Sequence, residues 1–235
     1  MAAADNSIAA NLAAIRERIS RAAERSGRGA GEVTLVAVSK TFPAESIRAA
    51  YDLGLRHFGE NRVQEWESKR SALSELDATW HLIGHLQSNK ARRAANLFHR
   101  VDSVDSLGLA QKLDAAAAAE GKRLSVLLEV HLGGEETKSG VAEDELQTLA
   151  EGVAALRNLE LLGVMTIPPY FEDPERARPY FRKLRELRDG LRARIGKPPG
   201  VLSMGMSHDF EIAIEEGATE VRIGTALFGE RPRKP

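Results

Sequence analysis

The residue in this chain best placed to do chemistry is Lys40, which follows an unbroken stretch of apolar and β-branched residues. Val33 to Val38 form that stretch, and Ser39 and Lys40 come directly after it. Such a run is typical of a strand buried on both faces. Apolar surroundings lower the pKa of a lysine amine, and a neutral amine condenses with aldehydes. The alternative is a lysine that ends a strand and extends its ammonium group into water.

A second group of residues, near the C-terminus, suits the binding of a phosphate. Ser207 and Thr225 follow the last two predicted strands and offer hydroxyl donors, while Gly224 lets backbone N–H groups approach an anion. A helix that begins near Asp209 would direct the positive end of its dipole to the same place. The alternative is that Ser207 caps this helix and Gly224 serves only a turn.

Together the two groups favour a phosphorylated aldehyde as ligand. The commonest such cofactor is pyridoxal 5′-phosphate, and a sugar phosphate cleaved by an aldolase is the other fit. Arg222 bears on this choice, because an arginine beside the pyridine nitrogen cannot accept its proton and leaves the ring a poor electron sink. The alternative for Arg222 is a salt bridge with Glu220 or Glu230.

These residues can meet only if strand ends converge, and the order of elements predicts that they do. Eight apolar strands alternate with helical segments, which predicts a parallel sheet closed into a single (β/α)8 barrel of the TIM type. An open doubly wound sheet is the alternative. An amphipathic helix over about 6–26 precedes the barrel, which spans about 33–230, and we expect residues 1–235 to form one domain. The predicted strands cover 33–40, 56–59, 79–84, 100–103, 124–132, 159–165, 201–206 and 220–223.

Composition narrows the class of protein. The formal net charge is −1, so no charge excess attracts nucleic acid or an anionic membrane surface. The chain has no cysteine, which removes disulfides and thiolate metal sites and fits a reducing compartment. No apolar run reaches the roughly 18 residues of a membrane span, and the N-terminus lacks the pattern of a signal peptide. We expect a cytoplasmic protein without nucleic-acid or membrane partners.

Six motifs occur in an order that resembles one known family. They are Val36-Ala37-Val38-Ser39-Lys40, Phe58-Gly59-Glu60-Asn61, Trp80 to Lys90, Gly163-Val164-Met165-Thr166-Ile167, Leu202 to Ser207, and Val221-Arg222-Ile223-Gly224-Thr225. The chain thereby resembles the pyridoxal phosphate homeostasis proteins, which are barrels similar to the N-terminal domain of alanine racemase. The resemblance covers Val33 to Gly229.

The resemblance implies a role for each residue of the site. Lys40 would carry pyridoxal phosphate as an internal aldimine, Arg222 would face the pyridine nitrogen, Ser207, Gly224 and Thr225 would hold the phosphate, and Asn61 and Met165 would line the ring. One departure is Arg62, which stands where an aromatic residue is expected and leaves the loop after the second strand in doubt.

The implied function is a protein of intracellular pyridoxal phosphate homeostasis, which holds the cofactor and releases or transfers it without robust catalysis. Apo forms of pyridoxal-phosphate enzymes would be the recipients, and we expect a monomer. The alternative is a weak amino-acid racemase that uses Lys40 with water or Tyr170. No metal is expected, because Trp80 to Gly84 is predicted to be a strand rather than a helix, so that His81 and His85 point differently. Roles for His85, Lys138 and the helix over 174–195 stay open.

Overall fold

Eight parallel strands close into a barrel in chain order, with β1 hydrogen-bonded to both β2 and β8. The structure is a computed structural model and describes residues 2–133, 139–192 and 200–230. The predicted (β/α)8 barrel is confirmed, and the open doubly wound sheet is ruled out because β8 pairs with β1. The strands are β1 (Thr34–Val38), β2 (His57–Glu60), β3 (Thr79–Leu82), β4 (Arg100–Val104), β5 (Leu124–Glu129), β6 (Leu159–Met165), β7 (Val201–Met206) and β8 (Glu220–Ile223).

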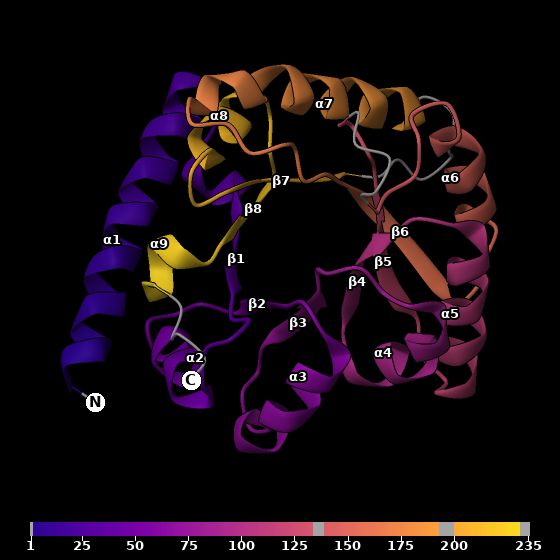
Figure 1. Cartoon of the computed structure of the whole chain (residues 1–235), viewed down its shortest axis with the longest axis horizontal. Helices are drawn as coiled ribbons and strands as arrows, with labels where there is room; N and C mark the ends of the chain where they lie inside the picture. Colours follow the sequence, from indigo (N-terminus) through magenta and orange to yellow (C-terminus); the bar gives the residue numbers. More distant parts are fainter. Residues whose placement is uncertain (1, 134–138, 193–199, 231–235) are drawn as a thin grey trace.

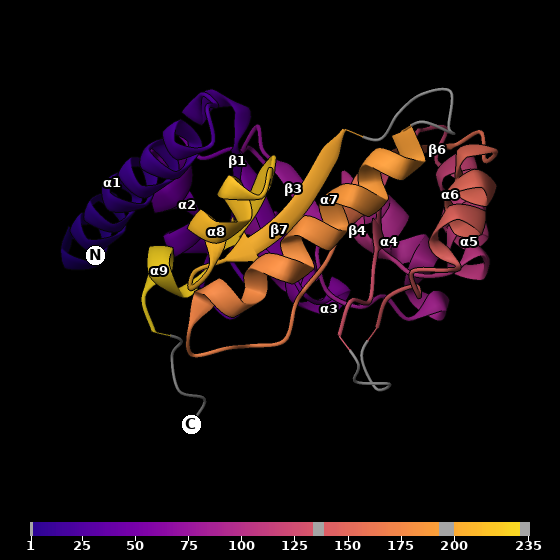
Figure 2. The same cartoon turned by 90° about the horizontal axis from the view of Figure 1, so that it is seen from above.

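Helices surround the barrel on all sides (Figure 1), and the view from above shows α7 running alongside β7 (Figure 2). No helix in the described part of the chain combines the length and the apolar content needed to cross a membrane. The helices are α1 (Ala2–Arg25), α2 (Ala44–Asp52), α3 (Val63–Lys69), α4 (Ala91–Leu97), α5 (Leu107–Ala119), α6 (Leu146–Ala154), α7 (Arg178–Arg192), α8 (Phe210–Glu215) and α9 (Thr225–Phe228).

The predicted N-terminal helix is present as α1 and packs against α8 and α9, the last helices of the described chain. Its stripe of Ile8, Leu12, Ile15 and Ile19 is buried, as the three- and four-residue spacing predicts. A salt bridge of 2.7 Å between Arg18 and Glu211 of α8 adds to the contact. The helix therefore covers the side of the barrel where β8 meets β1.

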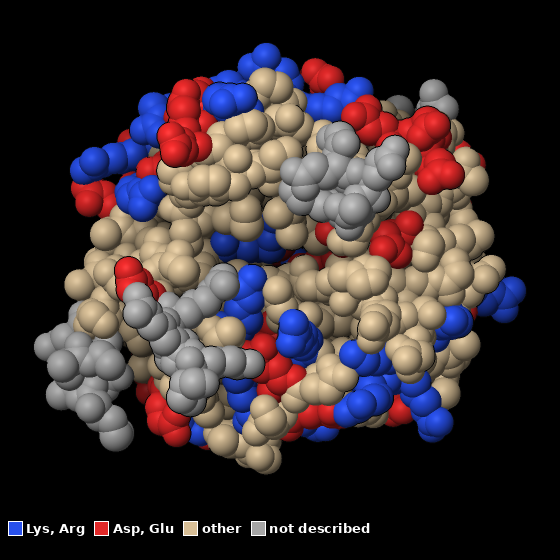
Figure 3. All heavy atoms as spheres, viewed as in Figure 1, with Lys and Arg blue, Asp and Glu red and all other residues tan. Residues whose placement is uncertain are grey.

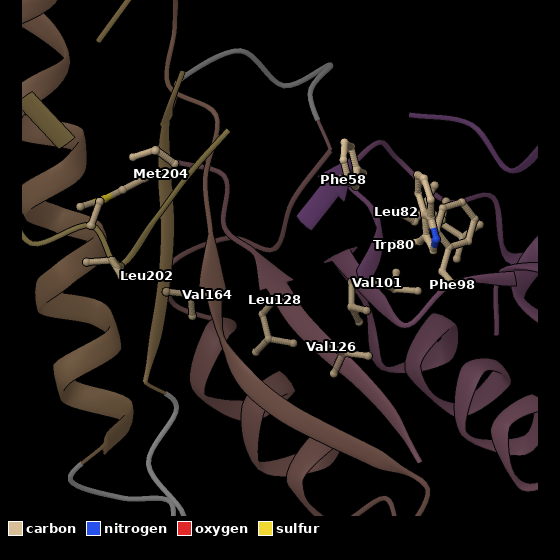
Figure 4. Packing of buried hydrophobic residues seen from close by; sticks show 14 of the residues in the cluster. Phe58, Trp80, Leu82, Phe98, Val101, Val126, Leu128, Val164, Leu202 and Met204 are labelled. Atoms are coloured by element: carbon tan, nitrogen blue, oxygen red, sulfur yellow. The ribbon is translucent and has the colours of Figure 1, made fainter. Parts of the chain in front are cut away.

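The two faces of the strands bury different kinds of side chain. Outward-facing residues such as Phe58, Trp80, Val126 and Val164 join one apolar cluster between sheet and helices (Figure 4). Because successive side chains in a strand alternate between faces, the neighbours of these residues point into the barrel. Many of those are polar or charged and still buried: Arg100, Asp102, Glu129, Ser203, Glu220 and Arg222.

Three strands end earlier than the sequence predicts, and one of them, β3, stops at Leu82 rather than at Gly84. β1 stops at Val38, so Ser39 and Lys40 belong to the loop that follows it. β5 stops at Glu129, and Val130 beyond it makes an isolated bridge with Val141. The early end of β5 matters for function, since it makes Glu129 the last residue of its strand.

Candidate functional site

A cavity of about 350 Å³ opens at the C-terminal end of the barrel, where Figure 3 shows the molecule hollowed, with blue Lys and Arg atoms in the hollow. Parallel barrels present ligand sites at this end. The cavity gathers the predicted site residues from four strand ends, with one exception. Those that line it are Lys40, Asn61, Ser207, Arg222, Gly224 and Thr225.

The exception is Met165, which does not line the cavity. It ends β6, is fully buried, and pairs in the sheet with Glu129 and Ser203. Its backbone carbonyl accepts a hydrogen bond of 2.7 Å from the Val130 N–H. Contact of Met165 with a ring in the cavity therefore stays a prediction.

Strained backbone follows Lys40 directly. Thr41 has a φ of 70°, in the left-handed region that a β-branched residue rarely adopts. Its N–H donates a hydrogen bond to the Glu65 carboxylate of α3, which holds the turn in place. Such strain persists only where surrounding contacts enforce it, and it is concentrated at functional sites. Here it fixes where the chain turns immediately after the lysine.

Lys69 supports the same turn from α3. Its ammonium donates to the Glu65 carboxylate at 2.8 Å, to the Glu60 carboxylate at 3.0 Å and to the Ser39 carbonyl at 3.1 Å. It thus ties the ends of β1 and β2 to one helix. Sequence reasoning missed this lysine, although its spacing of four residues from Glu65 indicates an ion pair on one helix face.

The predicted phosphate site has a different geometry from the one the sequence predicts. Asp209, not Ser207, precedes α8 and accepts a hydrogen bond of 2.7 Å from the Met206 N–H. Ser207 instead reaches across to the loop after β8. Its Oγ accepts hydrogen bonds of 3.3 Å from the N–H groups of both Gly224 and Ala226. Both N–H groups thus point at the Ser207 hydroxyl, which lines the cavity together with Gly224 and Thr225.

Glycine is required at Gly205 rather than at Gly224. Gly205 has a φ of 91°, and a Cβ there would lie 2.6 Å from the Ala213 Cβ and 2.9 Å from the Phe210 Cα. At Gly224 a Cβ would make only ordinary contacts, the nearest at 3.5 Å from Val38. Gly205 therefore lets β7 bend against α8 just before Ser207.

Arg222 is buried and held by neutral groups. Its Nη1 donates to the Ser203 Oγ at 2.7 Å and its Nη2 to the Thr166 carbonyl at 2.9 Å. In the described part of the chain it forms no salt bridge, and Glu220 is paired with Arg100 instead. The salt-bridge alternative for Arg222 is therefore wrong. Burial lowers the pKa of this guanidinium below its usual value, against the pull of distant carboxylates.

The cavity also contains polar residues that the sequence reasoning did not select. Glu129 and Ser139 line it, and the Ser139 Oγ donates a hydrogen bond of 3.1 Å to a Glu129 carboxylate oxygen. Glu129 was missed because the predicted strand ran on to Leu132 and hid the true strand end. The alternation of side chains along the strand is the signal that could have identified it, because this alternation places Glu129 on the face that points into the barrel.

A second hollow adjoins the site and has a volume of about 420 Å³. Asn61 and His85 line both hollows, and Arg62 lines only the second. The His85 ring lies 3.4 Å from the Asp105 carboxylate, whereas His81 lies inside the barrel 3.3 Å from Asp102. The two histidines thus point to different places. Lys138 and residues 193–195 of the predicted helix over 174–195 lie outside the described residues.

Comparison with known proteins shows which family the chain belongs to. The profile of the alanine racemase N-terminal domain matches residues 10–232. A pyridoxal phosphate homeostasis protein of Aquifex aeolicus is 52% identical over 220 residues, which cover 94% of this chain and 96% of the relative.

Solved structures agree. PipY of Synechococcus elongatus, with pyridoxal phosphate bound, superposes with a TM-score of 0.85 at 39% identity and covers 94% of this chain and 100% of PipY. Alanine racemase of Clostridium difficile shares the fold with a TM-score of 0.71 at 17% identity, with 97% of this chain matching 58% of the racemase. With matches along almost its whole length, the chain belongs to the alanine racemase N-terminal domain family, among the pyridoxal phosphate homeostasis proteins.

Proposed function

We propose that the protein binds pyridoxal 5′-phosphate through Lys40 and takes part in intracellular homeostasis of this cofactor, holding it and releasing it to other proteins. The observation that carries the proposal is one cavity in which the Lys40 side chain, the N–H groups around Ser207, and buried Arg222 meet. PipY, a relative at 39% identity, has been solved with this cofactor bound.

The residues present fit the chemical groups of pyridoxal phosphate. Hydroxyl and backbone N–H donors at Ser207, Gly224 and Thr225 suit a phosphate. Arg222 is fixed by neutral partners, so its guanidinium stays a donor toward an unprotonated pyridine nitrogen. The Lys40 amine suits the aldehyde: a C=N bond forms between them and the aldehyde oxygen leaves as water.

The same residues favour storage over catalysis. When bound, the cofactor supplies an electron sink, whose strength depends on protonation of its ring nitrogen. Arg222 cannot accept that proton, and among the described residues no carboxylate is hydrogen-bonded to it. Tyr170, which the racemase alternative names beside water as the second acid or base, is 77% exposed, and its ring lies 5.4 Å from the His208 ring. It is not among the residues that line the cavity.

The cellular setting is part of the proposal. We propose a monomeric protein of the cytoplasm whose recipients are apo forms of pyridoxal-phosphate enzymes. The lack of cysteine fits a reducing compartment, and the near-zero net charge favours neither nucleic acid nor membrane.

Two measurements on the loaded protein test holding against catalysis. We expect it to restore activity when mixed with an apo enzyme, and to exchange the α-hydrogen of amino acids with deuterated solvent no faster than free pyridoxal phosphate. Exchange at a catalytic rate that is lost in Tyr170→Phe would establish the racemase instead. Failure to reactivate any of several apo enzymes would contradict the transfer role.

A further inference from the structure

A buried carboxyl group in the cavity lacks a partner. Glu129 is 5% exposed, and one of its oxygens accepts the hydrogen bond from Ser139. Its Oε2 has no hydrogen-bond partner among the described residues. Buried polar atoms are almost always paired, because an unpaired one loses its hydration without compensation. An unpaired oxygen in a ligand cavity indicates an interaction that the ligand completes.

Glu60 shows that the situation of Glu129 is specific. Glu60 also has an unpaired Oε2, but its other oxygen accepts from the Lys69 ammonium at 3.0 Å and from the Ser39 Oγ at 2.7 Å. A cation thus compensates its charge, and Glu60 does not line the cavity. Glu129 does line the cavity, and no cation is hydrogen-bonded to it within the described chain.

The surroundings of Glu129 favour its neutral form. Burial raises the pKa of this carboxyl, and the hydrogen bond from Ser139 opposes the rise. Among the charged groups that act on it, Asp105 also raises the pKa, whereas Arg222 and His85 lower it, and Lys40 and His208 line the same cavity. A neutral carboxylic acid can donate a hydrogen bond, whereas a carboxylate can only accept one.

One oxygen of the ligand has no donor assigned to it in the proposed function. The following step rests on the proposed function. Pyridoxal phosphate has a phosphate, a pyridine nitrogen, an aldehyde and a phenolic oxygen. The first three are matched by the Ser207 and Gly224 group, by Arg222 and by Lys40. We propose that Glu129 donates a hydrogen bond from its unpartnered carboxyl oxygen to the phenolic oxygen of bound pyridoxal phosphate.

Two substitutions separate this role from a structural one. Glu129→Gln keeps a neutral donor of nearly the same shape, and Glu129→Leu removes the donor but fills the space. We expect Glu129→Leu to weaken binding of pyridoxal phosphate roughly three- to tenfold and Glu129→Gln to bind nearly as the native protein does. The ligand-free Glu129→Leu protein should unfold at the native temperature or above it, because an unpaired polar atom has been removed. A structural role would instead lower that temperature.

The decisive experiment removes the partner atom from the ligand as well. Dissociation constants are measured for native protein and Glu129→Leu with pyridoxal phosphate and with its 3-deoxy analogue, which lacks the phenolic oxygen. We expect the substitution to weaken only the binding of pyridoxal phosphate, so that the two changes are coupled. If native protein binds both ligands and Glu129→Leu weakens them equally, or not at all, the hydrogen bond is refuted while the proposed function stands. If native protein binds neither ligand, the proposed function fails as well.

Discussion

Charged groups are buried at both ends of the barrel, but they are paired more completely at one end than at the other. At the N-terminal end, hereafter the base, His57, His81, Arg100, Asp102 and Glu220 bond to one another. The Arg100 guanidinium donates to Asp102 at 2.6 and 2.9 Å and to both Glu220 oxygens at 2.6 Å. His81 contacts Asp102 at 3.3 Å and His57 at 3.1 Å. The protein itself supplies the partners here.

At the C-terminal end, hereafter the mouth, the pairing is incomplete. Arg222 has only neutral partners, and Glu129 keeps an oxygen without one in the described chain. The pKa values of the buried carboxyl groups shift in opposite directions at the two ends. Burial raises the pKa of Glu60, Glu129 and Asp209 at the mouth. At the base burial acts in the same direction on Asp102, but Arg100 and His81 outweigh it and lower its pKa.

This contrast assigns one end of the barrel interior to stabilising the fold and the other to binding a ligand. Active sites of such barrels lie at the C-terminal face, whereas the N-terminal face serves stability. The base also has a hollow of about 380 Å³ lined by His57, Arg100 and Glu220. A hollow with charged walls is therefore not evidence of a ligand site. Unpaired polar groups in the wall are the better indicator.

The largest expected effect is on stability at the base. Arg100→Met leaves Asp102 and Glu220 buried without their cation, and we expect it to lower the free energy of unfolding by about 3–5 kcal/mol. Urea denaturation measures the loss. Arg93→Met is the matched control, since its pair with Glu67 is at the surface and should contribute less than about 1 kcal/mol. Equal losses in the two variants would mean that the base network does not stabilise the fold.

The second effect is on binding at the mouth. Arg222→Met should weaken pyridoxal phosphate roughly 10- to 100-fold, because a charged donor to the ligand is lost. The same change should alter the free energy of unfolding by less than about 2 kcal/mol, since only neutral groups lose a partner. Cofactor titration and urea denaturation measure the two quantities. A variant that loses stability like Arg100→Met while binding normally would reverse the assignment of the two ends.

The third prediction uses pH, which should act oppositely at the two ends. A carboxyl with a raised folded-state pKa stabilises below its unfolded pKa of about 4, and this contribution is lost as pH rises through the folded pKa. Glu129 is such a group, so the native protein should lose stability relative to Glu129→Gln as pH rises. Asp102 has a lowered pKa, so native protein should gain stability relative to Asp102→Asn as pH rises from acid to neutral. Parallel trends for the two pairs would contradict the contrast.

The smallest effect concerns the strained turn after Lys40. Thr41→Gly should raise the free energy of unfolding by about 1 kcal/mol, because strain of about 1–3 kcal/mol is relieved and about 1 kcal/mol of backbone entropy opposes the gain. Thr34→Gly in β1 is the control and should destabilise the protein. Thermal unfolding distinguishes them, and destabilisation by both substitutions would show that the turn stores no strain.

The fold could be predicted from the sequence because each strand is a local run of apolar residues, and the order of these runs gives the order of the strands. Apolar runs bounded by Gly, Pro and polar residues placed β6, β7 and β8 at their observed bounds. Lys40, Ser207 and Arg222 could be selected because each follows or ends a predicted strand and its chemistry is distinctive.

What the sequence could not give depends on contacts between distant elements. The base network joins β2, β3, β4 and β8, and no local pattern shows that Arg100 will pair with Glu220 rather than leave it for Arg222. Lys69 in α3 donates a hydrogen bond to the Ser39 carbonyl and so holds the loop that carries Lys40. Glu129 ends β5, whereas the apolar residues that follow it extend the predicted strand to Leu132.

Reductive trapping of the cofactor decides whether Lys40 binds pyridoxal phosphate covalently. Native protein and Lys40→Arg are incubated with pyridoxal phosphate, reduced with borohydride, digested, and analysed by mass spectrometry. We expect a visible absorption band before reduction. After reduction, the Lys40 peptide of the native protein should carry a pyridoxyl phosphate group, and the corresponding peptide of Lys40→Arg should carry none. A native protein that stays colourless and unlabelled, or one labelled at Lys69 or Lys90 in place of Lys40, would contradict this expectation.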